Sequence, residues 1–163
     1  MASRQTKPRI WAYGVAPITN WIVEHVRRPL ALTITDVPSE HFEFARWRLE
    51  RKIPQSQARF TLTTLAVTGD ALPLTESYDV IVISEVFEHL HNPLAVARHL
   101  VEHLKPGGRL WENYLVTTPS ASDLKAAQEQ RGAVVAHLRD ACRLTAGGDP
   151  DSAPCDTRCW IRR

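Results

Sequence analysis

Residues 78–90 read Tyr-Asp-Val-Ile-Val-Ile-Ser-Glu-Val-Phe-Glu-His-Leu, and the rest of the chain can be understood from this segment outward. The run 80–83 is short, apolar and β-branched, which predicts a strand buried on both faces of a parallel sheet. Polar side chains end that strand abruptly. Ligands of open α/β sheets bind outside the carboxyl ends of the strands, so we expect Glu85, Glu88 and His89 to lie where chemistry takes place.

A helix and a further strand follow directly. Asn92 suits the N-cap of a helix, and Pro93 suits its first position, where the N–H that proline lacks would be unpaired anyway. The segment Lys-Pro-Gly-Gly at 105–108 ends the helix and leads into a strand over residues 109–117. The apolar side of the helix is predicted to comprise Leu94, Ala97, Leu100, Val101 and Leu104.

Strands and helices alternate in the first half of the chain as well. Apolar and β-branched patterns predict strands over residues 8–13, 30–35 and within 59–67. Helices are expected from about residue 18 to 27 and from a cap at Ser39 onward. Their buried sides are predicted to comprise Ile18, Ile22, Val23 and Val26 in the first helix and Phe42, Ala45, Trp47 and Leu49 in the second.

The last third of the chain predicts a long helix over residues 122–144 and a closing strand within 157–161. This alternation predicts an α/β fold with a Rossmann-like, doubly wound and mainly parallel sheet. We expect one domain over residues 1–163, with its core at 8–118, a C-terminal helix and closing strand at 119–163, and the strand order 3-2-1-4-5.

Composition excludes several classes of protein. The chain has 163 residues, 44% of them hydrophobic and 23% charged, which are ordinary globular values. A net charge of +2 gives no indication of nucleic-acid binding, and no apolar run approaches the roughly 20 residues of a membrane span. The N-terminus lacks the apolar core of a signal peptide, and three cysteines are too few for a disulfide framework. We therefore expect a cytoplasmic protein.

The segment 79–90, followed at the usual distance by Leu-Lys-Pro-Gly-Gly at 104–108, resembles class I S-adenosylmethionine-dependent methyltransferases. The resemblance extends over about residues 9–118 and is strongest over 69–110. It implies S-adenosylmethionine as cofactor and methyl transfer to a hydroxyl or amine of a small-molecule or macromolecular acceptor.

The resemblance also implies which residues contact the cofactor. Asp36, at the end of the second strand, matches the acidic residue that hydrogen-bonds the ribose hydroxyls, and Asp70 matches the residue that meets the adenine. A carboxylate accepts hydrogen bonds only, which suits a vicinal diol or an exocyclic amine. Each aspartate could instead be a helix-capping or turn residue. The other expected contacts are Tyr13, Gly14, Ala16, Ala71 and Ser84.

The first motif of the family departs from the expected pattern. An acidic residue, a spacer and Gly-x-Gly-x-Gly are replaced here by Ala12, Gly14, Ala16 and Ile18 at the corresponding positions. Side chains at residues 16 and 18 would crowd a backbone approach that glycine permits. A catalytically inactive pseudo-methyltransferase, serving as a binding or scaffold subunit, is therefore the alternative to an active enzyme.

The chain also matches a truncated form of the fold. It starts at the first strand, without the helices that usually cover the site, and leaves little sequence for the last two strands. We expect a second copy or a partner subunit to cover the missing lid through Trp21 or Trp47.

Glu85, Glu88 and His89 are the predicted catalytic residues, because one of them could take the acceptor proton. On a helical turn their spacing would project all three to one side, where they could also hold a divalent metal. The same Glu-x-x-Glu-His spacing resembles small-RNA 2′-O-methyltransferases and ubiquinone-pathway O-methyltransferases, in which it binds a metal. Ordinary loop and capping roles are the alternative.

Two further motifs favour structural roles. His99, Glu102 and His103 fit the His-x-x-Glu-His pattern of zinc proteases, but a solvated helix face explains them. Cys155 and Cys159 could form half of a zinc site, for which Cys142 would be the sole remaining thiol. The aromatic residues predicted to lie in the core or at an interface are Trp11, Trp21, Phe42, Phe44 and Trp47.

Overall fold

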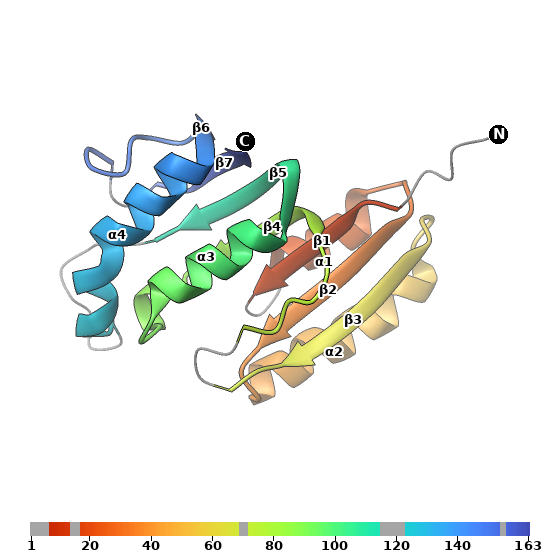
Figure 1. The fold of residues 1–163 in the computed structure, drawn as a ribbon. Helices are drawn as coiled ribbons and strands as arrows, with labels where there is room; N and C mark the ends of the chain where they lie inside the picture. The colour runs from red at the N-terminus through yellow and green to blue at the C-terminus, as the bar shows by residue number, and fades with distance from the viewer. Residues whose placement is uncertain (1–6, 14–16, 69–71, 115–122, 154–155) are drawn as a thin grey trace.

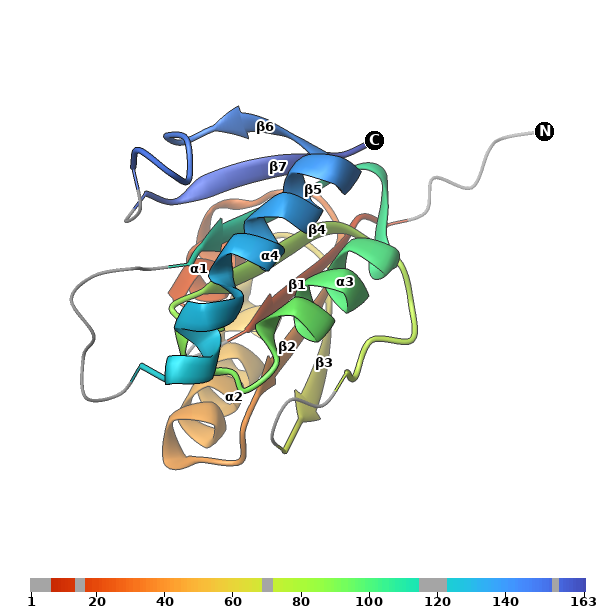
Figure 2. The same cartoon turned by 60° about the vertical axis from the view of Figure 1, so that its left-hand side comes forward.

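A seven-stranded sheet forms the centre of the molecule, with helices α1 and α2 on one face and α3 and α4 on the other (Figures 1 and 2). The computed structural model describes residues 7–13, 17–68, 72–114, 123–153 and 156–163. The strands are β1 (Arg9–Tyr13), β2 (Leu30–Asp36), β3 (Phe60–Ala66), β4 (Tyr78–Ser84), β5 (Leu104–Asn113), β6 (Cys142–Ala146) and β7 (Arg158–Arg162). The α-helices are α1 (Pro17–His25), α2 (Glu40–Lys52), α3 (Pro93–His103) and α4 (Lys125–Ala141), and short 3₁₀ helices are η1 (Ile53–Gln55) and η2 (Phe87–His89).

The strand order is β3-β2-β1-β4-β5-β7-β6, so the predicted order 3-2-1-4-5 is confirmed for the first five strands. These five strands are parallel. Their register aligns Tyr13 with Thr35 and Ser84 with Asn113, which brings the carboxyl ends of β1, β2, β4 and β5 to one edge. The α/β prediction and the Rossmann-like topology are therefore confirmed.

The end of the sheet corrects the expectation of a truncated fold. β5 pairs antiparallel with β7, and β7 pairs antiparallel with β6, so the chain does supply two strands after the fifth. The predicted helix over 122–144 ends at Ala141. Helical apolar spacing continues into β6, but residues 142–146 pair antiparallel with β7, a long-range interaction that the local pattern does not contain.

Two apolar cores lie on the two faces of the sheet. The core beneath α1 and α2 comprises Val23, Leu30, Leu32, Ile34, Phe42, Ala45 and Leu49. The larger core lies beneath α3 and α4 and includes Trp11, Ile81, Ile83, Phe87, Leu100, Leu110, Val134, Leu138 and Trp160. In the part of the chain that the structure describes, no helix is long and apolar enough to span a membrane.

The predicted caps are confirmed, but two residues predicted to be buried are exposed. Ser39 accepts a hydrogen bond from the N–H of Phe42 at 3.2 Å, and Asn92 accepts one from Ala95 at 3.2 Å. Ile18 is 43% exposed and Trp47 is 53% exposed. In α2 the buried positions recur every three or four residues, which places Trp47 on the opposite side of the helix. Ile18 likewise lies outside the Thr19–Val23 side of α1.

The connection from β3 to β4 crosses the α3 face of the sheet without a helix in its described residues. Parallel sheets normally bury both faces beneath crossover helices. Here Thr61 and Thr63 of β3 are exposed. The buried Leu74 anchors the crossover, because its N–H donates a hydrogen bond to Nε2 of His99 on α3 at 3.0 Å.

Candidate functional site

The carboxyl ends of the parallel strands bring several predicted cofactor residues to one edge of the sheet. Tyr13 ends β1, Asp36 ends β2 and Ser84 ends β4. Glu85 follows β4 directly and is exposed. The other four predicted cofactor residues, Gly14, Ala16, Asp70 and Ala71, lie outside the described residues.

Asp36 is half-buried and is not the capping residue of α2. Ser39 takes that role, which removes helix capping as an explanation for the aspartate. Oδ1 of Asp36 accepts the N–H of Val37 at 2.7 Å, and among the described residues no hydrogen bond reaches Oδ2. Burial raises the pKa of Asp36, while the Val37 hydrogen bond and the charge of His41 partly oppose that rise. A carboxylate in this state gains from a new hydrogen-bond donor.

Glu85 has a left-handed backbone conformation with φ of 56°. For a residue other than glycine this conformation costs about 1 kcal/mol or more. Asn113, at the end of β5, offsets the cost: its Oδ1 accepts the N–H of Glu85 at 2.7 Å, and its Nδ2 donates to Glu85 Oε1. The sequence analysis missed Asn113, because the strand predicted over residues 109–117 placed it mid-strand and its pairing with Ser84 is a long-range contact.

Glu88 points into the protein instead of toward the open edge. Its side chain is 3% exposed, and Oε2 has no hydrogen-bond partner among the described residues. Burial raises the pKa of Glu88, the charges of Glu85 and Asp123 raise it further, and the charge of His89 opposes them. The backbone carbonyl of Glu88 accepts the N–H of Leu124 at 2.9 Å, which links η2 to the start of α4.

Tyr114 completes the surroundings of Glu88. Its ring stacks on Phe87 with centroids 5.1 Å apart, and its hydroxyl donates to the carbonyl of Ala127. Burial raises the pKa of Tyr114 and the nearby charge of Glu88 raises it further, so the phenol stays protonated. Burial and the neighbouring carboxylates therefore both disfavour the charge of Glu88.

The three predicted catalytic residues do not share one side of an α-helical turn. Glu88 is buried, whereas Glu85 and His89 are exposed. The left-handed backbone at Glu85 precedes a 3₁₀ helix with three residues per turn, so the assumed α-helical spacing does not apply. A metal held by these residues stays a prediction that this arrangement does not favour.

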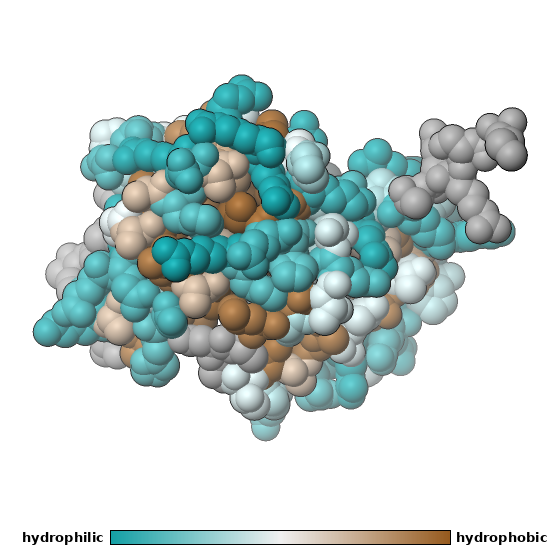
Figure 3. Space-filling model, in the orientation of Figure 1, coloured by the Kyte–Doolittle hydropathy of each residue, from teal (hydrophilic) through white to brown (hydrophobic). Residues whose placement is uncertain are grey.

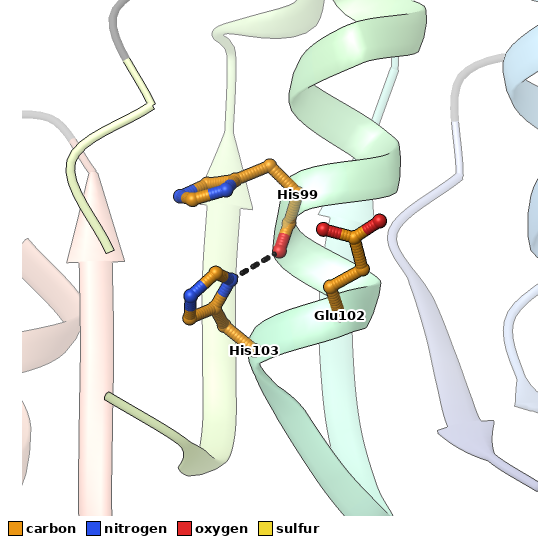
Figure 4. A group of neighbouring side chains, drawn as sticks. All are labelled: His99, Glu102 and His103. Carbon is orange, nitrogen blue, oxygen red and sulfur yellow. Dashed lines mark hydrogen bonds between the residues drawn. The ribbon is translucent and has the colours of Figure 1, made fainter. Parts of the chain in front are cut away.

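Among the described residues, three potential metal-ligating side chains come together at His99, Glu102 and His103, whose ligand atoms all lie within 4.8 Å of one another (Figure 4). His99 is partly buried, which corrects the expectation of a solvated face, and its Nε2 already accepts the N–H of Leu74. Nδ1 of His103 lies 2.9 Å from the carbonyl oxygen of His99. Burial lowers the pKa of His99, and the charge of His103 lowers it further. The cluster therefore anchors the crossover, and a metal at Nε2 would displace that bond.

An apolar cavity adjoins this edge on the α3 side of the sheet. Figure 3 shows apolar side chains between α3 and the crossover on a face that is otherwise mostly hydrophilic. The residues lining the cavity include Trp11, Tyr13, Leu72, Ile83, Val86 and His99.

Of the three cysteines considered for a zinc site, Cys155 lies outside the described residues, and Cys142 and Cys159 are buried free thiols.

A family model described as a methyltransferase domain matches residues 14–110, more than half of the chain. No curated protein matches the sequence. The fold is similar to that of the N-methyltransferase NodS from Bradyrhizobium japonicum WM9 in complex with S-adenosyl-L-homocysteine, with a TM-score of 0.63 and 19% identity. This similarity covers 95% of this chain and 78% of NodS.

Two further solved structures are similar at lower identity. Magnesium protoporphyrin IX methyltransferase from Synechocystis PCC 6803, with bound S-adenosylmethionine, has a TM-score of 0.64 and 12% identity over 98% of this chain and 72% of that protein. An O-methyltransferase family protein from Burkholderia thailandensis has a TM-score of 0.65 and 13% identity over 96% of this chain, which spans only 51% of that protein. The chain belongs to the methyltransferase domain family and has the Rossmann-like fold of class I methyltransferases.

Proposed function

We propose that the chain binds S-adenosylmethionine at the carboxyl edge of its sheet and transfers the methyl group to a hydroxyl or amine. The observation that carries this proposal is Asp36, a half-buried carboxylate that ends β2, caps no helix and has a raised pKa. A vicinal diol is the kind of donor pair that such a carboxylate lacks. The matched family model and the solved structures with bound cofactor or its product support S-adenosylmethionine as the cofactor.

Among the described residues, those at the ends of β1 and β2 suit the cofactor in chemistry and in position. Asp36 would accept the ribose hydroxyls, and Tyr13 at the end of β1 would line the neighbouring wall. α1 begins at Pro17, four residues after β1 ends, so its amino terminus lies at the edge where ligands of such sheets bind. The bound cofactor supplies an activated methyl group on a sulfonium. The protein would mainly orient the acceptor in line and exclude water.

Glu85 is the residue we expect to take the acceptor proton. It is exposed, and Asn113 holds only its Oε1 and backbone N–H. Oε2 is therefore the oxygen available to a substrate. His89 is also exposed and is the second residue that could take this proton. Glu88 is buried, so it would influence the site only through its charge. We also propose that the acceptor is a small molecule or a macromolecule and that the protein is cytoplasmic.

Substitution of Asp36 tests the cofactor site. Loss of one carboxylate–hydroxyl contact costs about 1.5–3 kcal/mol, so Asp36→Ala and Asp36→Asn should weaken binding of S-adenosylmethionine and of adenosine by roughly tenfold or more in calorimetry. Asp140→Asn is the matched control, because Asp140 is exposed near the end of α4, away from this edge. Unchanged affinity in the Asp36 variants would show that the pocket is not used in this way.

A pseudo-methyltransferase is the second candidate function. Two observations favour it: Glu85 shares its carboxylate with Asn113, and Glu88 is buried, so neither has the full freedom of a general base. A binding subunit would retain cofactor affinity without turnover. Incubation with tritiated S-adenosylmethionine and a size-fractionated cell extract separates the two functions. If the wild type transfers label to any fraction and Glu85→Gln does not, the protein is an active enzyme. If the wild type binds the cofactor but labels no fraction, it is a binding subunit.

A further inference from the structure

The outward side of α2 carries a line of four side chains that the fold does not use. Glu40, Phe44, Trp47 and Arg51 recur at alternating spacings of four, three and four, which places them along one side of the helix. We call this line the α2 seam. Phe44 is 51% exposed and Trp47 is 53% exposed, whereas the sheet-facing side of α2 is buried. Exposed aromatic side chains in contact with each other mark interaction surfaces more often than isolated ones do.

The aromatic part of the α2 seam is already ordered in the single chain. The rings of Phe44 and Trp47 stack with centroids 5.7 Å apart. The guanidinium of Arg48 lies 5.4 Å from the Phe44 centroid, and that of Arg51 lies 5.2 Å from the Trp47 centroid. Side chains held in this way lose little conformational entropy when a partner binds.

The neighbouring helix α1 also carries an exposed tryptophan. Trp21 of α1 is 57% exposed and stacks on His25 at 4.5 Å. An ion pair between Lys52 of α2 and Glu24 of α1 connects the two helices. The two linked helices therefore each present one exposed tryptophan.

The order of charges along the α2 seam makes it complementary to itself. Glu40 lies at the amino end, Arg51 at the carboxyl end, and the two aromatic rings lie between them. When two copies of α2 pack antiparallel about an axis between residues 45 and 46, Phe44 of each copy faces Trp47 of the other. The same axis places Glu40 of each copy opposite Arg51 of the other. An isologous interface requires this reciprocal pairing.

We propose that α2 is the contact surface of a symmetric dimer, in which two copies of this chain pack their α2 seams antiparallel. A second copy fits better than an acidic protein or a nucleic acid, because Glu40 would repel either polyanion but pairs with Arg51 in the dimer. The seam spans 11 residue steps, about 17 Å, which is short for a stable interface. The dimer should therefore dissociate in the micromolar range.

Charge reversal at the two ends of the seam tests the pairing. Glu40→Arg alone and Arg51→Glu alone each place like charges at both ends of the dimer, and each should weaken dimerisation by roughly 100-fold in sedimentation equilibrium. An equimolar mixture of the two variants restores an Arg–Glu pair at both ends, so it should form heterodimers of near wild-type affinity. Glu50→Arg is the matched control, because Glu50 is exposed on α2 about a quarter-turn from the seam.

Each result decides the proposal. Monomeric single variants that dimerise when mixed support it, provided that Glu50→Arg dimerises like the wild type and that circular dichroism shows every variant folded. A wild-type protein that stays monomeric up to about 1 mM, far above the expected dissociation constant, overturns it. Single variants that still dimerise, or a mixture that stays monomeric, also overturn it, and binding of the wild type to an acidic peptide or single-stranded RNA would then identify another occupant.

Discussion

Asp36 and Glu88 are carboxylic acids that folding withdraws from water, and burial is the largest cause of the raised pKa of each. They differ in what surrounds them. Asp36 is half-buried at the carboxyl edge, where a ligand can reach it. Glu88 lies within η2 and is 3% exposed, and its backbone carbonyl accepts the N–H of Leu124 at the start of α4. Both charges destabilise the unliganded fold, which is typical of functional sites, where stability and activity oppose each other.

Glu88→Gln should therefore stabilise the protein. The pKa of Glu88 is raised in the folded state, so its ionised form costs stability above the folded pKa, and that cost disappears as pH falls toward the unfolded value. We expect the variant to gain about 1 kcal/mol in urea unfolding at pH 7.5. The gain should vanish near pH 4. A variant that is less stable than the wild type at pH 7.5 would mean that the Glu88 charge is compensated.

At the residue scale, the sequence predicted where the site residues lie along the chain better than it predicted where their side chains point. The polar residues that end β2 and β4 were predicted at the correct edge, because strand alternation fixes where a strand stops. The orientation of Glu88 was not predictable, since the spacing argument assumed an α-helical turn. The left-handed Glu85 is held by hydrogen bonds to Asn113, 28 residues away, which no local pattern reveals.

Among the elements, the crossover from β3 to β4 depends on one hydrogen bond to α3. Leu74 is buried, and its N–H is bound by Nε2 of His99. Only a neutral imidazole can accept this bond, and the lowered pKa of His99 keeps the ring neutral. The segment that this bond anchors also contains residue 70, the position predicted for adenine contact.

His99→Ala should lower the free energy of unfolding by about 1 kcal/mol at pH 7.5 through the lost bond, in addition to a cavity cost that does not depend on pH. A histidine with a lowered folded pKa contributes stability above its unfolded pKa near 6.5 and loses it as pH falls toward the folded value. The difference from the wild type should therefore shrink between pH 7.5 and 5 in urea titrations. His91→Ala, at an exposed position, is the control, and a difference independent of pH would contradict this role.

The C-terminal strands depend on a buried ion pair. Arg158, 1% exposed on β7, lies 3.5 Å from Oε1 of Glu112 on β5. The same Glu112 oxygen accepts Nε1–H of Trp160 at 2.9 Å. Removing one partner of a buried pair leaves the other charge uncompensated, and the cost is usually several kcal/mol.

Arg158→Met should thus destabilise the protein by about 3 kcal/mol, the lower part of the usual range because Trp160 still binds Glu112. Arg143→Met, on the exposed side of β6, should change the unfolding free energy by no more than about 0.5 kcal/mol. Denaturant unfolding of the two variants side by side gives the comparison. Equal stabilities would show that the ion pair does not hold β7 to the sheet.

The elements with strong local signals were predicted most accurately. Strands β1 to β4 and helices α2 and α3 lie within a few residues of their predicted positions, because apolar runs and the caps Ser39 and Asn92 define them locally. β6 was missed because its pairing with β7 is a long-range interaction. Trp47 was predicted on the buried side of its helix and also as a residue of an interface; the helical repeat places it on the exposed side of α2.

At the scale of the whole molecule, the sheet order and the match over residues 14–110 place the chain in the methyltransferase domain family. The full sheet of seven strands shows that the loss of glycines in the first motif has not been accompanied by loss of the fold. Of that motif, Ile18 is exposed in the first turn of α1, whereas Gly14 and Ala16 lie outside the described residues. Retention of the fold and of the edge carboxylates leads us to expect that the site still binds its cofactor.

Calorimetric titration of the wild-type chain with S-adenosylmethionine, and with S-adenosylhomocysteine in parallel, tests this central claim most directly. We predict one binding site per chain with a dissociation constant of about 1–100 µM, weaker than an intact glycine motif would give if, as the sequence predicts, side chains at residues 16 and 18 crowd the methionine part. The absence of binding to either compound at about 1 mM, with the protein shown to be folded by circular dichroism, would contradict the account.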